Sequence, residues 1–544
     1  MIADIVVREK SFGDKLLMSD VRFSISDREK VGVVGRNGVG KSTLFAMLAG
    51  TDTDYTGEII YRKGMTVVAT QQEHHGLANE TVLGYVLSGL PEYAQLSHII
   101  ETYPLTMGDD MKKIAEYSTA LERFEQKGFY HIEEQIEREL EKFQLAGFGG
   151  HKMASLSGGQ KRLIEIVKIM HAQAQLALID EPTNHMDYVA KDQFIAWMKS
   201  APEAMLVITH DRDVLANVDR IVELKDGTSV SYRGNYDAYL KQNALKTSTG
   251  IHDHEMLERR RANLSDKITQ FRRLKEKARD PDTIKQFKRR EQQAAAELAD
   301  LATIEKPTFW IDKKSVEQLD YKAADNYQRY KARNIRMSIS SEESRSKHVL
   351  VRAVGLSLGY DTALFSGVTI DLREGEAVEL RGRNGAGKST LIKKLLGRSE
   401  DIKIFAGEVS LDPQVRVGIY EQEVDDAYFE LTLHEAIERI YLDRNLSISE
   451  TRIRQLMSDY LFTEADSQTP VARLSGGQKA RLQIIDMLSN EPQLLILDEP
   501  TNHLDLPSIE ELETALERYS GAILYVSHDN YFREAIGGTV VAVG

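Results

Sequence analysis

An internal repeat determines how this chain divides into domains. Four short segments of the first half return in the same order in the second half. They are GRNGVGKST at 35–43 and GRNGAGKST at 382–390, LSGGQKR at 156–162 and LSGGQKA at 474–480, LIDEPTNHMD at 178–187 and LDEPTNHLD at 497–505, and ITHD at 208–211 and VSHD at 526–529. Matches that recur in one order indicate a duplicated domain. Because 544 residues exceed what one hydrophobic core supports, we expect two related domains and a connector.

Each copy alternates short apolar runs with helix-like segments. Runs such as Val31–Val34 and Met205–Ile208 are typical of parallel strands buried beneath helices. The copies differ in one place, because the lysine of the first segment precedes the serine of the second by 116 residues in the first copy and by 87 in the second. The extra length falls at about 96–140, a Glu-, Lys- and Leu-rich stretch that predicts added helix.

A phosphate-binding motif opens each copy. The pattern G-x-x-x-x-G-K-[S/T] occupies Gly35–Ser42 and Gly382–Ser389, directly after an apolar run and before a helical stretch. Glycines let backbone N–H groups turn toward phosphates, the following helix presents its positive end, the lysine reaches the β- and γ-phosphates, and the serine binds Mg²⁺. The residues that we assign to the nucleotide here are Gly35, Asn37, Gly38, Gly40, Lys41, Ser42 and Thr43, and Gly382, Asn384, Gly385, Gly387, Lys388, Ser389 and Thr390.

An acidic pair ends an apolar run in each copy. Beside a phosphate-binding loop, the first carboxylate of such a pair can hold Mg²⁺ through water, and the second can orient and deprotonate the attacking water. A solvated loop edge is the alternative. The metal ligands predicted so far are Ser42, Asp180, Ser389 and Asp498, and the predicted catalytic carboxylates are Glu181 and Glu499.

Composition narrows the choice of metal and compartment. The chain has no cysteine, which excludes disulfides, thiolate zinc sites and cysteine-held iron–sulfur clusters. A metal would therefore need oxygen or imidazole ligands, as Mg²⁺ does. No run approaches the roughly 18 uncharged apolar residues that span a bilayer, and the charged start MIADIVVREK lacks a secretory signal. We expect a cytoplasmic protein without a membrane domain.

The LSGGQ segments make the chain resemble the ATP-binding cassette superfamily, so the two copies are called the first and second cassettes below. The resemblance implies ATP and Mg²⁺ as ligands, with two sites at which the signature of one cassette contacts the γ-phosphate held by the other. Lys41 would act with the second signature and Lys388 with the first. The signature residues assigned to the nucleotide are Ser157, Gly158, Gly159 and Gln160, and Ser475, Gly476, Gly477 and Gln478.

Six further residues match superfamily positions in pairs. They are the metal- and water-sensing glutamines Gln72 and Gln422, the catalytic switch histidines His210 and His528, and the adenine-stacking aromatics Phe12 and Tyr360. Each histidine follows the catalytic glutamate of its cassette by 29 residues, although an ordinary surface or core histidine is the alternative. For the two aromatics the alternative is plain core packing.

Residues 237–333 have no counterpart inside either cassette. Apolar residues recur at heptad-like steps on both sides of Pro281, which interrupts the helix. We therefore expect two antiparallel helices of roughly 45–55 Å at ~1.5 Å per residue. Residues 241–290 contain 15 Lys or Arg and 7 Asp or Glu, although the whole chain carries −14.

A basic rod on an acidic body suits a polyanion such as RNA. A solvated coiled coil that only spaces the cassettes is the alternative. The predicted RNA contacts are Arg272, Arg273, Lys275, Lys277, Arg279, Lys285, Lys288, Arg289 and Arg290. The segment that follows, 307–333, carries aromatic residues that could stack on RNA bases, and packing against the hairpin is the simpler interpretation.

The arrangement as a whole resembles the ABC-F family: two cassettes in one chain, DEPTNHxD in both, G-N-Y-x-x-Y at Gly234–Tyr239 and a charged helical connector. The resemblance implies a ribosome-binding translation factor whose linker enters the tRNA exit site and approaches the P-site tRNA and peptidyl-transferase centre, with large-subunit RNA and that tRNA as partners. Some members protect ribosomes from antibiotics.

The predicted fold class is therefore α/β, with two P-loop ATP-binding cassette domains at 1–236 and 334–544 joined by an α-helical hairpin linker at 237–333. The predicted activity is ATP hydrolysis by a monomer whose cassettes pair within the chain. Two other classes stay open: an ATPase subunit of a membrane transporter with separate membrane domains, and a cassette protein of DNA maintenance.

Overall fold

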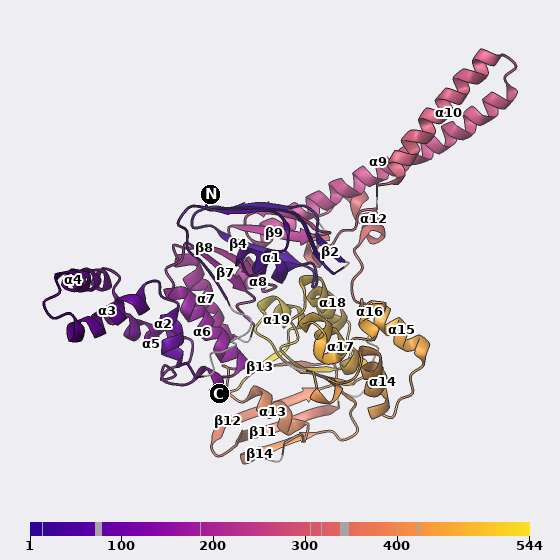
Figure 1. Ribbon diagram of the computed structural model, residues 1–544. Coiled ribbons are helices and arrows are strands. Elements are labelled where there is room, and N and C mark those ends of the chain that lie inside the picture. Colours follow the sequence, from indigo (N-terminus) through magenta and orange to yellow (C-terminus); the bar gives the residue numbers. More distant parts are fainter. Residues whose placement is uncertain are drawn as a thin grey trace. The chain divides into compact units, whose positions relative to one another are not determined.

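The computed structural model describes residues 1–13, 15–70, 79–184, 186–304, 306–316, 318–337, 348–399, 401–421 and 424–544. These residues form two compact units, one of Met1–Tyr236 with Ile335–Gly544 and one of Asp237–Asn334 (Figure 1). The first unit contains both cassettes, and the second contains the connector. Parallel strands alternate with helices in both cassettes, which confirms the predicted α/β class.

In the first cassette, a mostly parallel sheet carries the nucleotide motifs. Its strand order is β10-β9-β4-β8-β7-β6, in which β10 and β9 pair antiparallel and the other neighbours pair parallel. Strands β7 and β8 are buried along their whole length, as expected for a parallel sheet covered on both faces. The strands are β4 (Lys30–Gly35), β6 (Val67–Ala69), β7 (Leu176–Asp180), β8 (Ala204–Ile208), β9 (Arg220–Lys225) and β10 (Thr228–Arg233).

A second, antiparallel sheet of this cassette forms around β1, which pairs with β2, β3 and β5. Its inward side chains join the cassette core with Leu44, Phe45, Met47 and Leu48 of α1. These strands are β1 (Ala3–Phe12), β2 (Lys15–Met18), β3 (Val21–Ile25) and β5 (Thr56–Tyr61).

Helices of the first cassette include the added segment that the spacing predicts. Helices α3, α4 and α5 occupy 93–142, which confirms the predicted helix at 96–140. Helices α3 and α4 pack with the turn before α5 through a cluster of aromatic rings, in which Phe124 lies 5.8 Å from Tyr93 and 5.3 Å from Phe129 between ring centroids. The helices are α1 (Lys41–Leu48), α2 (Val82–Ser88), α3 (Tyr93–Thr106), α4 (Met111–Gln126), α5 (Ile132–Lys142), α6 (Gly158–His171), α7 (Tyr188–Ser200) and α8 (Arg212–Leu215).

The second cassette repeats this plan. Its parallel sheet has the order β15-β16-β17-β13-β18, and its antiparallel sheet has the order β12-β11-β14. The strands are β11 (Val349–Gly359), β12 (Ala363–Arg373), β13 (Ala377–Arg381), β14 (Lys403–Leu411), β15 (Val417–Tyr420), β16 (Leu494–Asp498), β17 (Ala522–Val526) and β18 (Thr539–Ala542). The helices are α13 (Lys388–Leu395), α14 (Leu433–Asp443), α15 (Glu450–Asp459), α16 (Glu464–Ser467), α17 (Gly476–Leu488), α18 (Leu506–Glu517) and α19 (Asn530–Ile536).

The connector forms the predicted helical hairpin from α9 (Tyr236–Lys277) and α10 (Pro281–Ala302). Helix α10 begins at Pro281 because the Asp280 carboxylate accepts a hydrogen bond from the Thr283 amide at 2.9 Å. Leu264 and Ile268 of α9 pack on Ala294 of α10. The hairpin therefore closes through the heptad-like positions read from the sequence.

The predicted helix lengths were wrong. Helix α9 has 42 residues and α10 has 22, about 63 and 33 Å at ~1.5 Å per residue. Helix α9 is longer because its first half pairs with the following segment rather than with α10. There Ala244 and Ile251 contact side chains of α12 (Tyr321–Tyr330), which follows the short α11 (Lys313–Val316).

Some aromatic side chains of 307–333 are buried, and others are exposed. Tyr327 and Tyr330 are 3% and 6% exposed in the cluster with α9, and the Ile311 amide donates to the Tyr327 hydroxyl at 3.1 Å. Tyr321 is 81% exposed. The packing interpretation is therefore confirmed for Tyr327 and Tyr330 and is wrong for Tyr321.

Candidate active site

Both phosphate-binding loops connect a buried strand to a helix. In the first cassette β4 ends at Gly35 and α1 begins at Lys41, and in the second the loop joins β13 to α13. Glycine is required just before each helix, because Gly40 and Gly387 have φ values of 103° and 97°. A Cβ atom there would also lie 2.9 Å from Met18 and from Phe365, respectively. The two glycines therefore set the turn that aims backbone amides into the loop.

The loop lysines lie over these turns. Lys41 Nζ donates to the carbonyls of Gly35 at 2.7 Å and Arg36 at 3.2 Å. Lys388 Nζ makes the equivalent contacts to Gly382 and Arg383 at 2.8 and 2.9 Å. Both side chains are buried, which lowers the pKa of each ammonium, while the acidic pair of the same cassette opposes that shift. A phosphate entering the loop would meet a desolvated cation.

The side-chain atoms around the predicted metal position are hydroxyl and carboxylate oxygens. Ser389 Oγ donates to Asp498 Oδ2 at 2.7 Å, which joins the end of β16 to the start of α13. In the first cassette Asp180 is 4% exposed and Ser42 is exposed. Hydroxyl and carboxylate oxygens are ligands that Mg²⁺ prefers, with water and phosphate completing its coordination. These residues fit Mg²⁺ bound together with a nucleotide.

The predicted catalytic carboxylates adopt an unusual backbone conformation. Glu181 and Glu499 have φ values of 45° and 53°, in the left-handed region that is uncommon for residues other than glycine. Their amides donate to the carbonyls of Ile208 and Val526 at 2.7 and 3.0 Å, which holds the turn at the strand end. The strained turn directs each carboxylate out of the sheet toward the histidine of the neighbouring strand.

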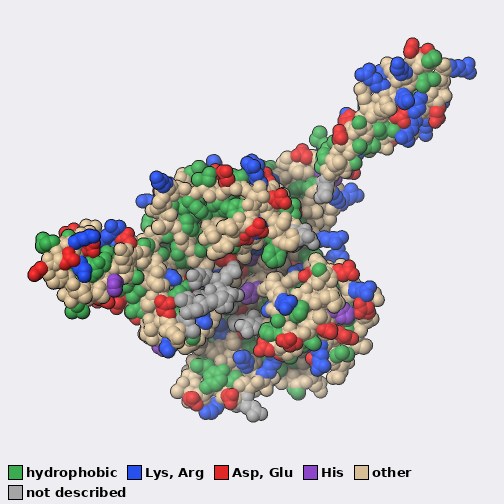
Figure 2. All heavy atoms as spheres, in the orientation of Figure 1, with side chains coloured by type: hydrophobic (Ala, Val, Ile, Leu, Met, Phe, Trp, Pro, Cys, Tyr) green, Lys and Arg blue, Asp and Glu red, His purple; other side chains and the backbone are tan. Residues whose placement is uncertain are grey.

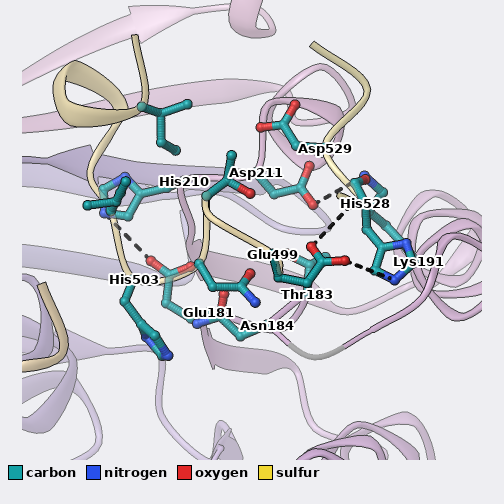
Figure 3. Close-up of a pocket in the computed structure, with 14 residues that line it drawn as sticks. Glu181, Thr183, Asn184, Lys191, His210, Asp211, Glu499, His503, His528 and Asp529 are labelled. Carbon is teal, nitrogen blue, oxygen red and sulfur yellow. Dashed lines mark hydrogen bonds and ion pairs between the residues drawn. The ribbon is translucent and has the colours of Figure 1, made fainter. Parts of the chain in front are cut away.

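The two histidines lie beside these carboxylates (Figure 3). His210 Nε2 is 3.7 Å from Glu181, and His528 Nε2 is 3.2 Å from Glu499. Among the described residues, both ring nitrogens of His210 and Oε1 of Glu499 are buried without a hydrogen-bond partner. Buried polar atoms of this kind fit a site that is completed by a polar ligand.

Burial shifts the pKa of these groups in the direction that base catalysis needs. It raises the pKa of Glu181 to about 8 and that of Glu499 to about 7. It lowers the pKa of His210 and of His528 to about 3, so both imidazoles are neutral at pH 7. A carboxylate whose pKa lies near the working pH is an effective general base.

Each signature segment begins a helix. Ser157 and Ser475 form capping boxes with Gln160 and Gln478 at the first turns of α6 and α17, so each serine hydroxyl accepts the amide of its glutamine at 3.3 Å. In the first signature nothing in the described structure lies within 4 Å of a Cβ built at Gly158, whereas in the second a Cβ at Gly476 would lie 3.4 Å from the His503 ring. Amides at a helix N-terminus favour anions such as phosphate.

The P-loop of each cassette contacts the other cassette. Asn37 donates from its backbone amide to Asp505 and from its side chain to the His503 carbonyl, both at 2.9 Å. In the reciprocal contact, the Asn384 amide donates to Asp187 at 3.0 Å. The second signature lies beside the first contact, because a Cβ at Gly477 would be 2.2 Å from Asn37 Nδ2. The structure thus brings the first P-loop and the second signature together.

Four other predicted site residues are either exposed on the surface or lie outside the described residues. Phe12 and Tyr360 are 77% and 44% exposed, so the core-packing alternative is wrong for both, and stacking on adenine stays a prediction. Gln72 and Gln422 lie outside the described residues. The cluster of acidic or histidine side chains that a protein-only metal cage would need is absent from the described residues.

Predicted RNA contacts lie at the end of α9, in the turn and in the first turns of α10. Eight of the nine are exposed and Lys275 is half-buried. Arg272 and Lys275 both pair with Glu291, at 2.9 and 2.5 Å. The other seven make no ion pair within the described structure. Figure 2 shows Lys and Arg side chains gathered around this end of the hairpin.

Sequence reasoning missed residues that act across the cassettes. Asp187 and Asp505 are the last residues of the repeated DEPTNHxD segments, and each also caps a helix by accepting the amide of Ala190 or Ser508. Their presence in the repeat was a usable signal. Lys191, Arg212 and Glu513 also link the cassettes, and no repeated pattern marked them.

Comparison with known proteins agrees with this geometry. A family model described as "ABC transporter" matches residues 18–184 and 365–502, and another with the same description matches 222–317. The Bacillus subtilis protein YdiF is 31% identical over 99% of this chain and 80% of its own length. The energy-dependent translational throttle protein EttA of Mycobacterium tuberculosis is 28% identical over 96% of this chain and 88% of its own length.

A solved structure titled "RNase-L Inhibitor" has the same fold, with a TM-score of 0.57 and 17% identity over 99% of this chain and 87% of that one. Within the described residues, no helix combines the length and apolarity needed to cross a membrane. The duplicated P-loop and signature, the connector and relatives that align over 96% and 99% of this chain agree: the chain belongs to the ABC-F family of twin ATP-binding cassette proteins.

Proposed function

We propose that this protein hydrolyses ATP to ADP and phosphate at two composite sites and that pairing of its cassettes controls binding of the hairpin to the ribosome. The observation that carries the composite sites is the contact of Asn37 with His503 and Asp505, mirrored by that of Asn384 with Asp187. A nucleotide on either P-loop would therefore lie against the opposite cassette.

Each site would divide the reaction among its residues. Loop amides and Lys41 or Lys388 bind the β- and γ-phosphates, and the opposite signature helix donates amides to the γ-phosphate. Mg²⁺, held through Ser42 with Asp180 or Ser389 with Asp498, would neutralise phosphate charge. Glu181 or Glu499 orients the attacking water and takes its proton. Hydrolysis removes the group that both cassettes grip, so the cassettes can part.

The ribosome is the proposed partner for two reasons. A relative that aligns along nearly the whole chain is named for an energy-dependent effect on translation. The hairpin end also presents basic side chains that are exposed and, in seven cases, make no ion pair within the described structure, as electrostatic binding to RNA requires. We place this end in the tRNA exit site, facing the P-site tRNA and the peptidyl-transferase centre, and the protein in the cytoplasm.

A hairpin end at that centre would compete with antibiotics bound there. We therefore propose, in addition, that the protein protects ribosomes from such antibiotics. This proposal predicts a higher minimum inhibitory concentration for drugs of that site when the protein is produced in a susceptible strain. An unchanged concentration for every such drug would remove this extension and leave ribosome binding intact.

Co-sedimentation with ribosomes, membranes and DNA tests the partner. The variant Lys277→Glu, Lys285→Glu, Lys288→Glu, Arg289→Glu changes basic side chains without breaking the ion pairs of Glu291. It should bind ribosomes more weakly and flatten the salt dependence by about 0.7–0.9 in log–log slope for each phosphate that the hairpin no longer neutralises.

The matched control reverses four exposed basic residues of the cassettes: Lys63, Lys199, Arg352 and Lys393. It should sediment as the wild type does. Equally weakened binding in both variants would mean that only total charge matters, and sedimentation with membranes or DNA instead of ribosomes would favour one of the other two classes.

A further inference from the structure

A group of buried and half-buried charges joins the cassettes beside the second catalytic glutamate. We call it the charge cluster; it consists of Lys191, Arg212 and Asp213 of the first cassette and Glu513 and Asp529 of the second. Lys191 is 3% exposed and Arg212 is 4% exposed. Lys191 comes from the first turn of α7 and points toward the His528 loop (Figure 3).

The charge cluster holds three successive residues of the His528 loop. Lys191 Nζ donates to the His528 carbonyl. Arg212 donates to the Asp529 carboxylate at 3.1 Å, and Asn530 donates from its side chain to Asp213 at 2.8 Å. The first cassette therefore grips the loop that carries the second histidine.

This grip fixes the histidine against the glutamate. The His528 amide donates to Glu499 Oε2 at 3.2 Å, while its ring nitrogen lies 3.2 Å from Glu499 Oε1. Because the carbonyl, amide and ring belong to one residue, moving the carbonyl moves both contacts to Glu499. Lys191 thus acts on the second carboxylate through His528 rather than by touching it.

The two cassettes differ in sequence at the positions of these side chains. Lys191 and Ile509 occupy corresponding positions, because each lies ten residues after the catalytic glutamate of its cassette. Ile509 cannot donate a hydrogen bond to the His210 loop. Corresponding positions also pair Arg212 with Asn530 and Asp213 with Tyr531. The chemistry that grips the His528 loop is therefore missing from the reciprocal positions.

Lys191 keeps its charge in this setting. Burial works to lower the pKa of the Lys191 ammonium, but Asp211 at 3.5 Å and Asp213 in direct contact outweigh it and leave the pKa above its usual value. A charged donor makes a stronger hydrogen bond to a carbonyl than a neutral one.

We propose that Lys191 is a positioning residue through which hydrolysis at Glu499 depends on a contact of the first cassette with the His528 loop, in addition to the opposite signature that both composite sites need, whereas hydrolysis at Glu181 depends on the opposite signature without such a contact. The inference rests on the proposed composite ATPase. Its consequence is that the two sites hydrolyse ATP at unequal rates: the Glu499 site needs the contact with the His528 loop as well as the opposite signature, and the Glu181 site needs only the signature. A small displacement of a catalytic contact can slow chemistry by about 100-fold.

Single-turnover hydrolysis of pre-bound ATP tests this, with the phases assigned by the variants Glu181→Gln and Glu499→Gln. Lys191→Met should slow the Glu499 phase about 10- to 100-fold and leave the Glu181 phase within about twofold. ATP affinity of both P-loops, measured with a fluorescent analogue, should stay unchanged. Lys191→Arg keeps a cation and should restore most of the wild-type rate. Ile509→Met, at the corresponding position, should alter neither phase.

Two outcomes would overturn the inference while leaving the ATPase intact. One is equal slowing of both phases by Lys191→Met without rescue by arginine, which would indicate a general structural role. The other is an Lys191→Met protein that behaves as the wild type does. Absence of hydrolysis in the wild-type protein would instead overturn the proposed function itself.

Discussion

Removing Arg212 should open the cassettes. Arg212 contacts Glu513 and Asp529 across the interface, and the side chains of all three are at most 10% exposed. Its guanidinium also lies 4.8 Å from the ring centroid of Tyr531. Arg212→Met keeps an apolar stem of similar length but removes the guanidinium that contacts two buried carboxylates. Breaking a buried pair in this way costs about 3–5 kcal/mol.

Because 1.36 kcal/mol corresponds to a factor of ten, a cost of about 3–5 kcal/mol would shift the closed–open equilibrium by roughly 150- to 5,000-fold. The absence of native cysteines allows fluorescent labels on Ile60→Cys and Ile404→Cys, which lie at exposed positions of the two cassettes. Energy transfer between these labels, followed against ATP concentration, would report closure. Arg212→Met should need far more ATP than the parent protein to close.

Arg454→Met is the matched control, because Arg454 pairs with Glu450 at 2.9 Å with both side chains more than half exposed. Exposed pairs contribute less than about 1 kcal/mol, so closure should hardly change. Adding Glu513→Gln to Arg212→Met should restore part of the closure by removing one uncompensated charge. Closure of Arg212→Met at the same ATP concentration as Arg454→Met would show that Arg212 does not hold the cassettes together.

Two further predictions concern the signature and the connector. Ser475→Arg should slow hydrolysis at the Lys41 site by at least tenfold, because a bulky cation would occupy the γ-phosphate position next to Asn37. Single-turnover rates measured for each site would show this slowing. Full activity of each cassette in isolation would contradict it. Tyr327→Ala should lower the stability of the connector by about 3–5 kcal/mol, because Tyr327 is 3% exposed and its hydroxyl accepts a hydrogen bond from the Ile311 amide. Amide hydrogen exchange should become faster within 237–334 only. Unchanged exchange there would show that Tyr327 does not stabilise the connector.

The repeated motifs were readable because each requires particular residue types at fixed local spacing. Glycine before a helix at Gly40, a serine N-cap at Ser157 and a carboxylate after a buried strand at Glu181 are local solutions, so the sequence alone predicts the elements that carry them. The helical hairpin was equally readable, because Pro281 and the apolar steps on either side are local signals.

Contacts across the cassettes were not readable in the same way. Lys191 and Arg212 look like ordinary surface residues of amphipathic helices, and only the tertiary arrangement buries them against Asp529 and Glu513. The length of α9 was misjudged for a related reason, because its first half is stabilised by residues such as Tyr330 that lie far along the chain. Exposure of Phe12 also depends on tertiary packing, which periodicity does not report.

We propose that ATP binding pairs the cassettes on the ribosome and that hydrolysis releases them. Glu181→Gln with Glu499→Gln keeps size and hydrogen bonding but lacks the carboxylate base, so hydrolysis should slow by about 10²- to 10⁴-fold while ATP still binds. Lys41→Ala with Lys388→Ala serves as the control that binds ATP poorly. The direct measurement is the rate at which each protein dissociates from purified ribosomes in the presence of ATP. The double glutamine protein should remain bound and block translation. Dissociation as fast as that of the wild type would show that hydrolysis is not the release step.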